Sequence, residues 1–184
     1  MEKMKSYGIV SFSGDTKAGP FYEQIHSGRK TLTLRKRRKD GRAHVKPGYS
    51  FPMYWMVRKK KEEKPIHYIG RAECVAYESV KIVDRWHDTE FAKSDGFEDL
   101  DEFRDNWFPG WREFRWLDEI LEAYYSLKEQ KVATLTIVNW GRRYGKNTIV
   151  AFLELEYMKI GWKHPLIDVG SKEKDAGVWR SERR

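Results

Sequence analysis

The stretch from Phe21 to Arg35 reads Phe-Tyr-Glu-Gln-Ile-His-Ser-Gly-Arg-Lys-Thr-Leu-Thr-Leu-Arg, and it predicts a short helix joined directly to a strand. The proline just before it suits the first turn of a helix, and Gly28 is the residue type that most often ends one. The alternation that follows predicts a strand with both leucines on one side. On the other side lie Thr31, Thr33 and Arg35, where polar groups can line a pocket.

On either side of this stretch, the sequence pattern predicts further strands, which are interrupted by a helical segment. Strands are expected at residues 6–13, 30–35, 49–57, 66–82, 132–140 and 148–157, and helices at 95–108 and 113–130. This order predicts the α+β class, with a small, mostly antiparallel β-barrel flanked by helices. We expect one domain over residues 1–163, with an extra helix and hairpin inserted at about 109–146 and a polar tail at 164–184.

Basic residues are concentrated early in the chain. The 184 residues include 36 Lys or Arg and 28 Asp or Glu, which gives a formal net charge of +8. Residues 29–46 contain nine Lys or Arg against a single acid, Asp40. A strongly basic surface attracts polyanions, so the charge pattern favours a nucleic-acid or nucleotide partner over a neutral substrate. The alternative for such a run is a solvated loop.

Several classes of protein are excluded by what the sequence lacks. One cysteine, Cys74, builds neither a disulfide framework nor a cysteine-rich zinc site. The histidines are not at metal-ligand spacings and the glycine-rich nucleotide motifs are missing, so we expect no metal and no cofactor. No apolar run approaches the roughly 18 residues of a membrane span. The start of the chain is charged where a secretory signal is apolar, so we expect no membrane partner and a cytoplasmic location.

These segments resemble the ASCH family of PUA-like β-barrels. In that family a helix ends at glycine and a Gly-x-Lys-Thr-x-Thr-x-Arg-like strand follows, as from Gly28 to Arg35 here. The turn at Pro47–Gly48, the acid-Gly-Phe run at Asp95–Phe97 and a closing strand at 149–156 are also similar. The resemblance implies a PUA-like barrel.

The resemblance covers roughly residues 4–108 and 146–160, and it implies a barrel pocket for a nucleobase or an RNA segment. Some bacterial members look like amidohydrolases that remove the acetyl group from N4-acetylcytidine with a lysine, a threonine nucleophile and a glutamate. The matching positions here are Lys30, Thr33 and Asp95, the last one methylene shorter than the family's glutamate.

The residue types suit that chemistry. A threonine hydroxyl attacks an amide carbonyl only if a base takes its proton, and a lysine buried in a pocket has its pKa lowered enough to act as that base. Asp95 could hold the lysine or protonate the leaving amine, whereas a plain helix N-cap is its alternative role. Arg35 could bind a phosphate, or the carbonyl of a base, as a fork.

Our first interpretation is an RNA-binding or modified-nucleoside-binding protein with a basic pocket on the barrel. The alternative is a metal-independent amidohydrolase acting on an acylated nucleoside; a ribonuclease and a protein-interaction module built on residues 111–131 are further alternatives. The residues expected to contact the ligand are Arg29, Lys30, Thr31, Thr33, Arg35, Arg37, Arg38, Arg142, Arg143 and Tyr144.

Overall fold

The computed structural model describes residues 4–59, 66–114, 117–130 and 146–169, in an α+β arrangement. Its strands are β1 (Val10–Phe12), β2 (Asp15–Thr16), β3 (Gly19–Pro20), β4 (Leu32–Arg35), β5 (Ser50–Trp55), β6 (Tyr68–Lys81), β7 (Glu156–Trp162) and β8 (Asp168–Val169). Its α-helices are α1 (Phe21–Ser27), α2 (Thr89–Ser94), α3 (Leu100–Trp107), α4 (Leu117–Glu129) and α6 (Lys146–Leu153). Two short 3-10 helices are η2 (Ile82–Arg85) and η3 (Trp111–Glu113).

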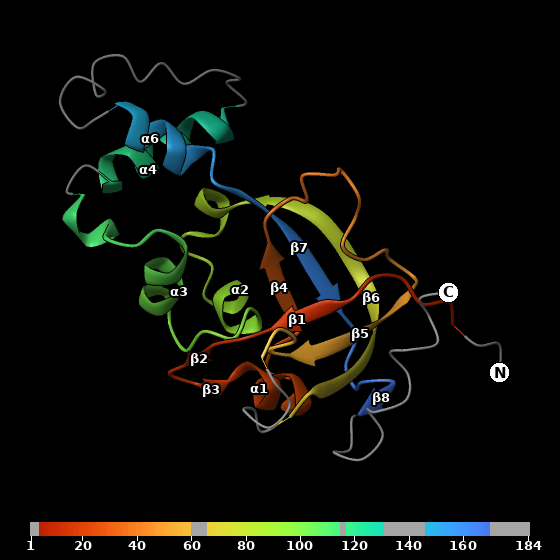
Figure 1. Cartoon of the computed structure of the whole chain (residues 1–184). Coiled ribbons are helices and arrows are strands. Elements are labelled where there is room, and N and C mark those ends of the chain that lie inside the picture. Colours follow the sequence, from red (N-terminus) through yellow and green to blue (C-terminus); the bar gives the residue numbers. More distant parts are fainter. Residues whose placement is uncertain (1–3, 60–65, 115–116, 131–145, 170–184) are drawn as a thin grey trace.

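Five strands form a curled sheet in the order β1-β5-β6-β7-β4, with β8 paired to β6 off this path. Only β1 and β5 are parallel; the other pairs in this order are antiparallel. The 14-residue β6 pairs with β5 near its start and with β7 further on, and its register with β7 shifts between Cys74 and Ala76. Such irregularities bend a strand, and β6 curves around one side of the molecule (Figure 1). The prediction of a mostly antiparallel α+β fold is confirmed as a half-barrel with helices.

A side chain bridges the two end strands of this order, β1 and β4. The Nη2 of Arg35 in β4 donates a hydrogen bond of 2.5 Å to the backbone carbonyl of Ser11 in β1. The same guanidinium lies 5.2 Å from the centre of the Phe12 ring. We call this gap between β1 and β4, bridged by Arg35 and Ser11, the seam of the half-barrel.

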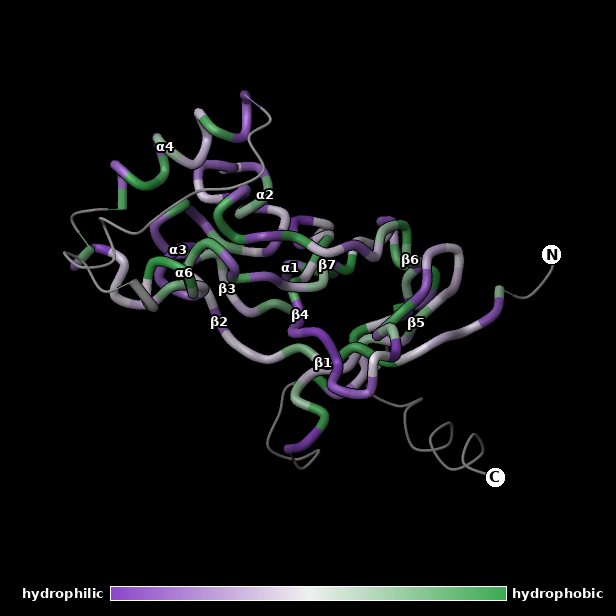
Figure 2. The backbone as a smooth tube through the Cα atoms, turned by 90° about the horizontal axis from the view of Figure 1, so that it is seen from above, coloured by the Kyte–Doolittle hydropathy of each residue, from purple (hydrophilic) through white to green (hydrophobic). Residues whose placement is uncertain are grey.

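Among the described residues, the apolar core has two clusters. The sheet cluster contains Phe12, Phe51 and Ile160 and belongs mainly to the half-barrel strands. The helix cluster surrounds Trp86, whose ring centre lies 5.0 Å from that of Phe152 in α6. Seen from two directions, α4 and α6 lie at the opposite end of the molecule from β5 (Figures 1 and 2).

The stretch that predicts a helix joined to a strand forms one. The helix α1 ends at Gly28, which adopts the left-handed φ of 79° and donates its backbone N–H to the Ile25 carbonyl. Leu32 and Leu34 are both buried in the helix cluster, as the alternation predicts. Local signals decide this segment because glycine is the residue type best suited to the left-handed turn.

The prediction of a strand at 148–157, which the family resemblance also implies for 149–156, is wrong for residues 148–155. The chain forms α6 and then β7, and β7 takes the place beside β6 and β4. Ile149, Phe152 and Leu153 have the spacing of a helical stripe, and all three are buried in the helix cluster. Packing of that stripe outweighs the strand propensity of the β-branched residues before it. The strand expected at 132–140 lies outside the described residues.

The helix expected at 95–108 is interrupted. The chain instead ends α2 at Ser94, with Asp95 as its C-cap, and starts α3 at Leu100 with Asp99 as the N-cap. Gly96 between them has a φ of 94°, which side-chain-bearing residues rarely adopt. The alternative role of Asp95 as a helix N-cap is therefore wrong, because Asp95 follows α2 as its C-cap.

After β7 the chain returns to the sheet. Of the expected tail at 164–184, residues 164–169 are described, and they include β8, which pairs with Gly70 and Arg71 of β6. Residues 170–184 lie outside the described part. Among the helices that the structure describes, none has the length and apolarity needed to cross a membrane.

Candidate functional site

A lysine and an aspartate form an ion pair in the interior. Lys30 and Asp95 are 1% and 2% exposed, and Lys30 Nζ lies 2.8 Å from Asp95 Oδ1. The same ammonium donates to the backbone carbonyl of Asp95 and lies 4.3 Å from the centre of the Phe21 ring. The aspartate side chain therefore reaches the lysine directly.

Backbone hydrogen bonds fix both partners of the pair. After the turn at Gly28, the Lys30 N–H donates to the Gln24 carbonyl, and the Thr31 N–H donates to the Ser94 carbonyl at the end of α2. The chain just before β4 is thus hydrogen-bonded to α1, which precedes Lys30, and to α2, which precedes Asp95. A Cβ added to Gly96 would lie 2.9 Å from the Phe21 ring, so the residue after Asp95 has no room for a side chain.

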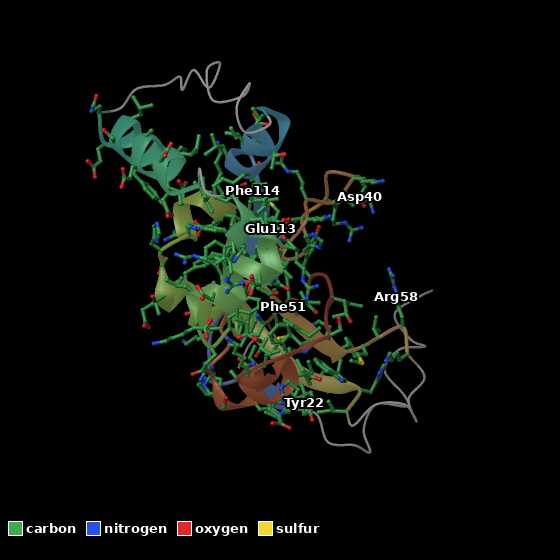
Figure 3. The ribbon with its side chains drawn as sticks, turned by 90° about the vertical axis from the view of Figure 1, so that its left-hand side faces the viewer. Tyr22, Asp40, Phe51, Arg58, Glu113 and Phe114 are labelled. Carbon is green, nitrogen blue, oxygen red and sulfur yellow. The ribbon has the colours of Figure 1, made fainter. Side chains whose placement is uncertain are left out.

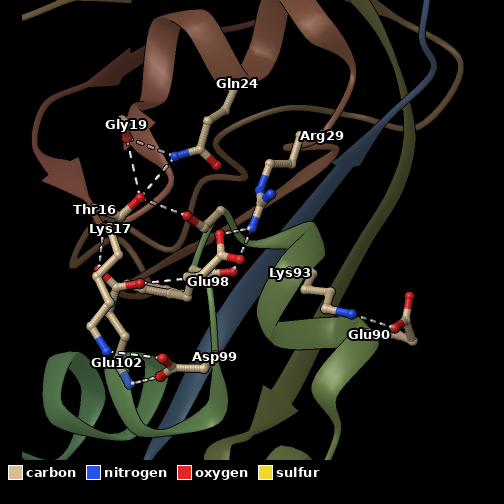
Figure 4. A network of polar contacts seen from close by, with 12 residues as sticks. Thr16, Lys17, Gly19, Gln24, Arg29, Glu90, Lys93, Glu98, Asp99 and Glu102 are labelled. Atoms are coloured by element: carbon tan, nitrogen blue, oxygen red, sulfur yellow. Dashed lines mark hydrogen bonds and ion pairs between the residues drawn. The ribbon is translucent and has the colours of Figure 1, made fainter.

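A surface network holds the loop after Asp95 against the short β2–β3 hairpin. The Thr16 hydroxyl donates to the Gly96 carbonyl, and Lys17 pairs with Asp99 at 2.9 Å (Figure 4). The buried Gln24 amide reaches across to the same threonine hydroxyl. This network positions the loop from outside, while the buried ion pair positions it from within.

Burial shifts both charged groups toward their neutral forms. It lowers the pKa of the Lys30 ammonium and raises the pKa of the Asp95 carboxyl, and in each case the partner's charge opposes the shift. The position of Asp95 at the negative end of α2 acts in the same direction as burial. The proton shared across 2.8 Å therefore has two acceptors of more similar basicity than in water.

The pair lines a small cavity of about 120 Å³, which we call the inner cavity. Its walls include Phe21, Lys30, Thr33, Arg35, Asp95 and Trp107. Thr33 is 6% exposed, and its hydroxyl makes no hydrogen bond with a described residue. The three residues that the family resemblance implies as catalytic thus surround one space.

A larger cavity of about 460 Å³, the outer cavity, adjoins the inner one at the seam. Arg35 and Ser13 line both spaces. Ser11, Arg58 and Lys59 also line the outer cavity. The burial of Arg35 lowers the pKa of its guanidinium, an effect that Asp95 opposes. Arg35 therefore lies between the inner cavity, which has room for about four water molecules, and the outer cavity, which has the size typical of ligand sites.

Three buried polar atoms in the inner cavity's walls lack a well-formed hydrogen bond to any described residue. One is Nε of Arg35, and the other two are Oδ2 of Asp95 and the indole Nε1 of Trp107. The indole is close enough to help lower the pKa of the Asp95 carboxyl, opposing the effect of burial. A ligand with a donor for the carboxylate and an acceptor for the indole would satisfy both atoms.

The other expected ligand residues lie elsewhere. Arg29 pairs with the exposed Glu98 at 2.5 Å, and Arg38 pairs with Asp40 at 2.7 Å (Figure 4 shows the first pair). Thr31 and Arg37 line neither cavity. The remaining three, Arg142, Arg143 and Tyr144, lie outside the described residues.

Residues of both cavities were missed by the sequence reasoning. Ser11 and Ser13 lie in and after β1, and Trp107 ends α3, far from the Lys30 segment in the chain. Phe21 stands inside the quoted stretch, where its helical spacing suggests a core residue. No sequence signal marks them, because only the tertiary fold brings them to the seam.

Within the described ranges, no group of three or more His, Cys, Asp or Glu is placed to hold a metal ion. The polar groups of the two cavities' described walls are two ammonium groups, two guanidinium groups, one carboxylate, hydroxyls, one amide and an indole N–H. Comparison with known proteins gives no assignment: no family model, no curated protein and no solved structure matches this chain.

Proposed function

We propose that this protein binds RNA or a nucleoside part of it at the seam, as a member of the ASCH/PUA-like group. The observation that carries the proposal is the buried Lys30–Asp95 pair in the wall of a cavity that adjoins a basic, open one. A charge pair removed from water is expensive, so its place beside a cavity, rather than in solid core, favours a functional role.

The chemistry of the inner cavity suits one edge of a nucleobase. Thr33 offers a hydroxyl, Asp95 an acceptor and Trp107 a donor, while Phe21 and Phe12 supply apolar walls. Nucleobases carry donors and acceptors along one edge of an otherwise apolar ring, and unpaired bases are recognised through such contacts. The inner cavity is smaller than a typical ligand site, so the rest of the ligand would extend through the seam.

The binding proposal is tested with a matched pair of threonine variants. We expect cytidine, measured by calorimetric titration, to bind the unmodified protein, and Thr33→Val to weaken binding about fivefold or more because a hydrogen bond is lost. Thr31→Val is the control, since Thr31 lines neither cavity. Absence of binding by all four common nucleosides and by single-stranded RNA would contradict the proposal.

A second candidate, hydrolysis of an acylated nucleoside such as N4-acetylcytidine, is favoured by the lowered pKa of Lys30 in the wall of the cavity that Thr33 also lines. Thr33 Oγ1 would attack the amide carbon while its proton passes to the neutral Lys30 amine. The leaving amine takes that proton as the C–N bond breaks, which leaves an ester on Thr33. Water then cleaves the ester and regenerates the hydroxyl.

Conversion of N4-acetylcytidine to cytidine and acetate, followed by mass spectrometry, decides between the two candidates. Under the hydrolysis proposal Thr33→Val abolishes turnover, Thr33→Ser retains part of it, and Thr31→Val leaves it unchanged. If the unmodified protein binds N4-acetylcytidine without converting it, the hydrolysis proposal is wrong and the binding proposal stands.

A further inference from the structure

The outer cavity is basic on every charged wall that the structure describes. Arg35, Arg58 and Lys59 line it, and none of its described lining residues is acidic. Figure 3 shows Arg58 on the loop that follows β5, at the margin of the molecule. Three cationic side chains around one confined space raise the positive potential within it.

Arg35 has unused hydrogen-bonding capacity. It is partly buried, its Nη2 donates to the Ser11 carbonyl, and its Nε is buried without a partner among the described residues. No carboxylate of the described residues lies within ion-pair distance of its guanidinium. A guanidinium has five N–H donors, and taking its charge out of water is costly. The charge of Asp95 opposes part of that effect from beyond ion-pair distance. An anion bound in the outer cavity would accept from the unused donors and add a second negative charge.

The neutral groups of the outer cavity are also donors. The Ser11 hydroxyl accepts the Val57 N–H at 3.3 Å, which leaves its own proton available, and the Ser13 hydroxyl has no partner among the described residues. The loop that carries Arg58 begins at Met56, whose φ of 43° is rare for a residue with a long side chain. Residues held in such backbone conformations cluster at active sites, ligand clamps and switch regions.

We propose that the outer cavity is a phosphate-binding subsite, so that the ligand of this protein is a phosphate ester rather than a free nucleoside. This rests on the proposed function, because it places the phosphate beside the base-binding inner cavity. A phosphate offers several oxygens in a tetrahedron, which suits donors that come from β1, β4 and the loop after β5 together. Arg35, shared by both cavities, would contact the ligand between base and phosphate.

Calorimetric titrations of the full chain with cytidine, with cytidine 5′-monophosphate and with inorganic phosphate test the subsite. We expect the monophosphate to bind at least about tenfold more tightly than cytidine, as expected for charge-assisted hydrogen bonds. The double variant Arg58→Gln/Lys59→Gln should abolish this difference and leave cytidine affinity unchanged. Arg42→Gln/Lys163→Gln, which removes the same two charges from exposed positions outside both cavities, should preserve it.

The outcomes separate the subsite from the proposed function. If cytidine binds as well as its monophosphate, or if both double variants lose affinity equally, the subsite is overturned while base binding stands. If the monophosphate and inorganic phosphate bind and cytidine does not, the subsite is supported and nucleoside binding is contradicted. If no probe binds, both proposals fail.

A fourth probe distinguishes the two sources of a phosphate ester. The trinucleotide CpCpC, without a terminal phosphate, presents only phosphodiesters. If it gains affinity over cytidine and loses it in Arg58→Gln/Lys59→Gln, the subsite recognises an RNA strand, and its affinity should fall with rising salt. If only the monophosphate shows the gain, the subsite recognises a free nucleotide.

Discussion

The Lys30–Asp95 pair has an energetic role apart from any ligand. Both side chains are nearly inaccessible to water, and the attraction between them offsets a desolvation penalty of several kcal/mol per ion. Removing one partner leaves the other buried without compensation. The Arg29–Glu98 pair nearby is of similar geometry but exposed, so its net contribution is expected to be small.

We therefore expect Asp95→Asn to lower the free energy of unfolding by about 3 kcal/mol, because the ammonium of Lys30 would lose its counter-charge. Glu98→Gln, the matched control at the exposed pair, should change it by about 1 kcal/mol or less. Urea unfolding followed by circular dichroism measures both. Equal effects of the two substitutions would show that burial does not determine how much each ion pair contributes to the free energy of unfolding.

His87 gives the protein a pH dependence of defined sign. Although His87 is exposed, partial desolvation of its ring, and then the positive charge of Arg104, lower its pKa; Arg104 Nη2 lies 2.9 Å from the ring Nδ1. Between the lowered value and the ordinary 6.5, the unfolded chain binds more protons than the folded one. The free energy of unfolding should therefore rise with pH across that window and level off above it.

Urea unfolding between pH 5 and pH 8 measures this rise, with His87→Gln as the comparison. Glutamine keeps an acceptor for Arg104 but does not titrate, so we expect a flatter curve for the variant. Identical pH dependence in the two proteins would assign the effect to other groups.

At the scale of elements, the sequence predicts well those helices and strands that local signals determine, and poorly those that tertiary packing determines. The segment α1–Gly28–β4 was predictable because a left-handed glycine and strict alternation act within a few residues. The helix α6 was not, because Thr148, Ile149 and Val150 favour a strand and only burial of Ile149 against the helix cluster reverses that preference. The break at Gly96 has a different cause: the helical spacing of Phe97, Leu100 and Phe103 predicts one continuous helix and masks the local signal of a glycine with a φ of 94°.

A helix-breaking substitution in α6 tests its assignment. Ala151 is exposed and lies inside the helix, so Ala151→Pro should lower the free energy of unfolding by about 3 kcal/mol. Ala151→Gly should lower it by only about 1 kcal/mol. Thermal unfolding of the two variants measures the difference. A proline variant as stable as the glycine variant would contradict a helix at this position.

At the scale of the whole molecule, the sequence predicted residue types of the candidate site but not their full surroundings. One predicted strand places Lys30, Thr33 and Arg35 at the site, whereas only the family resemblance indicates Asp95. The contributions of Ser11, Ser13 and Trp107 depend on the curl of the sheet, which brings β1 beside β4. The curvature of the sheet depends on many small contributions along β6, and no single residue predicts it.

The two core clusters should unfold together because β4 and β7 are hydrogen-bonded but contribute to different clusters. Leu32 and Leu34 of β4 belong to the helix cluster, whereas Ile160 of β7 belongs to the sheet cluster. Separate melting of either cluster would therefore break a shared ladder. We expect one cooperative transition, coincident by tryptophan fluorescence and by circular dichroism.

Two conservative core substitutions examine this coupling from either side. Ile120→Val in the helix cluster and Ile69→Val in the sheet cluster should each cost about 1 kcal/mol and lower the same Tm by about 3 °C. Both probes should shift by the same amount in each variant. If Ile120→Val moved only part of the transition, the helix cluster would be a separate folding unit, and residues 109–153 would have to be treated as a second domain rather than as an insertion in the first.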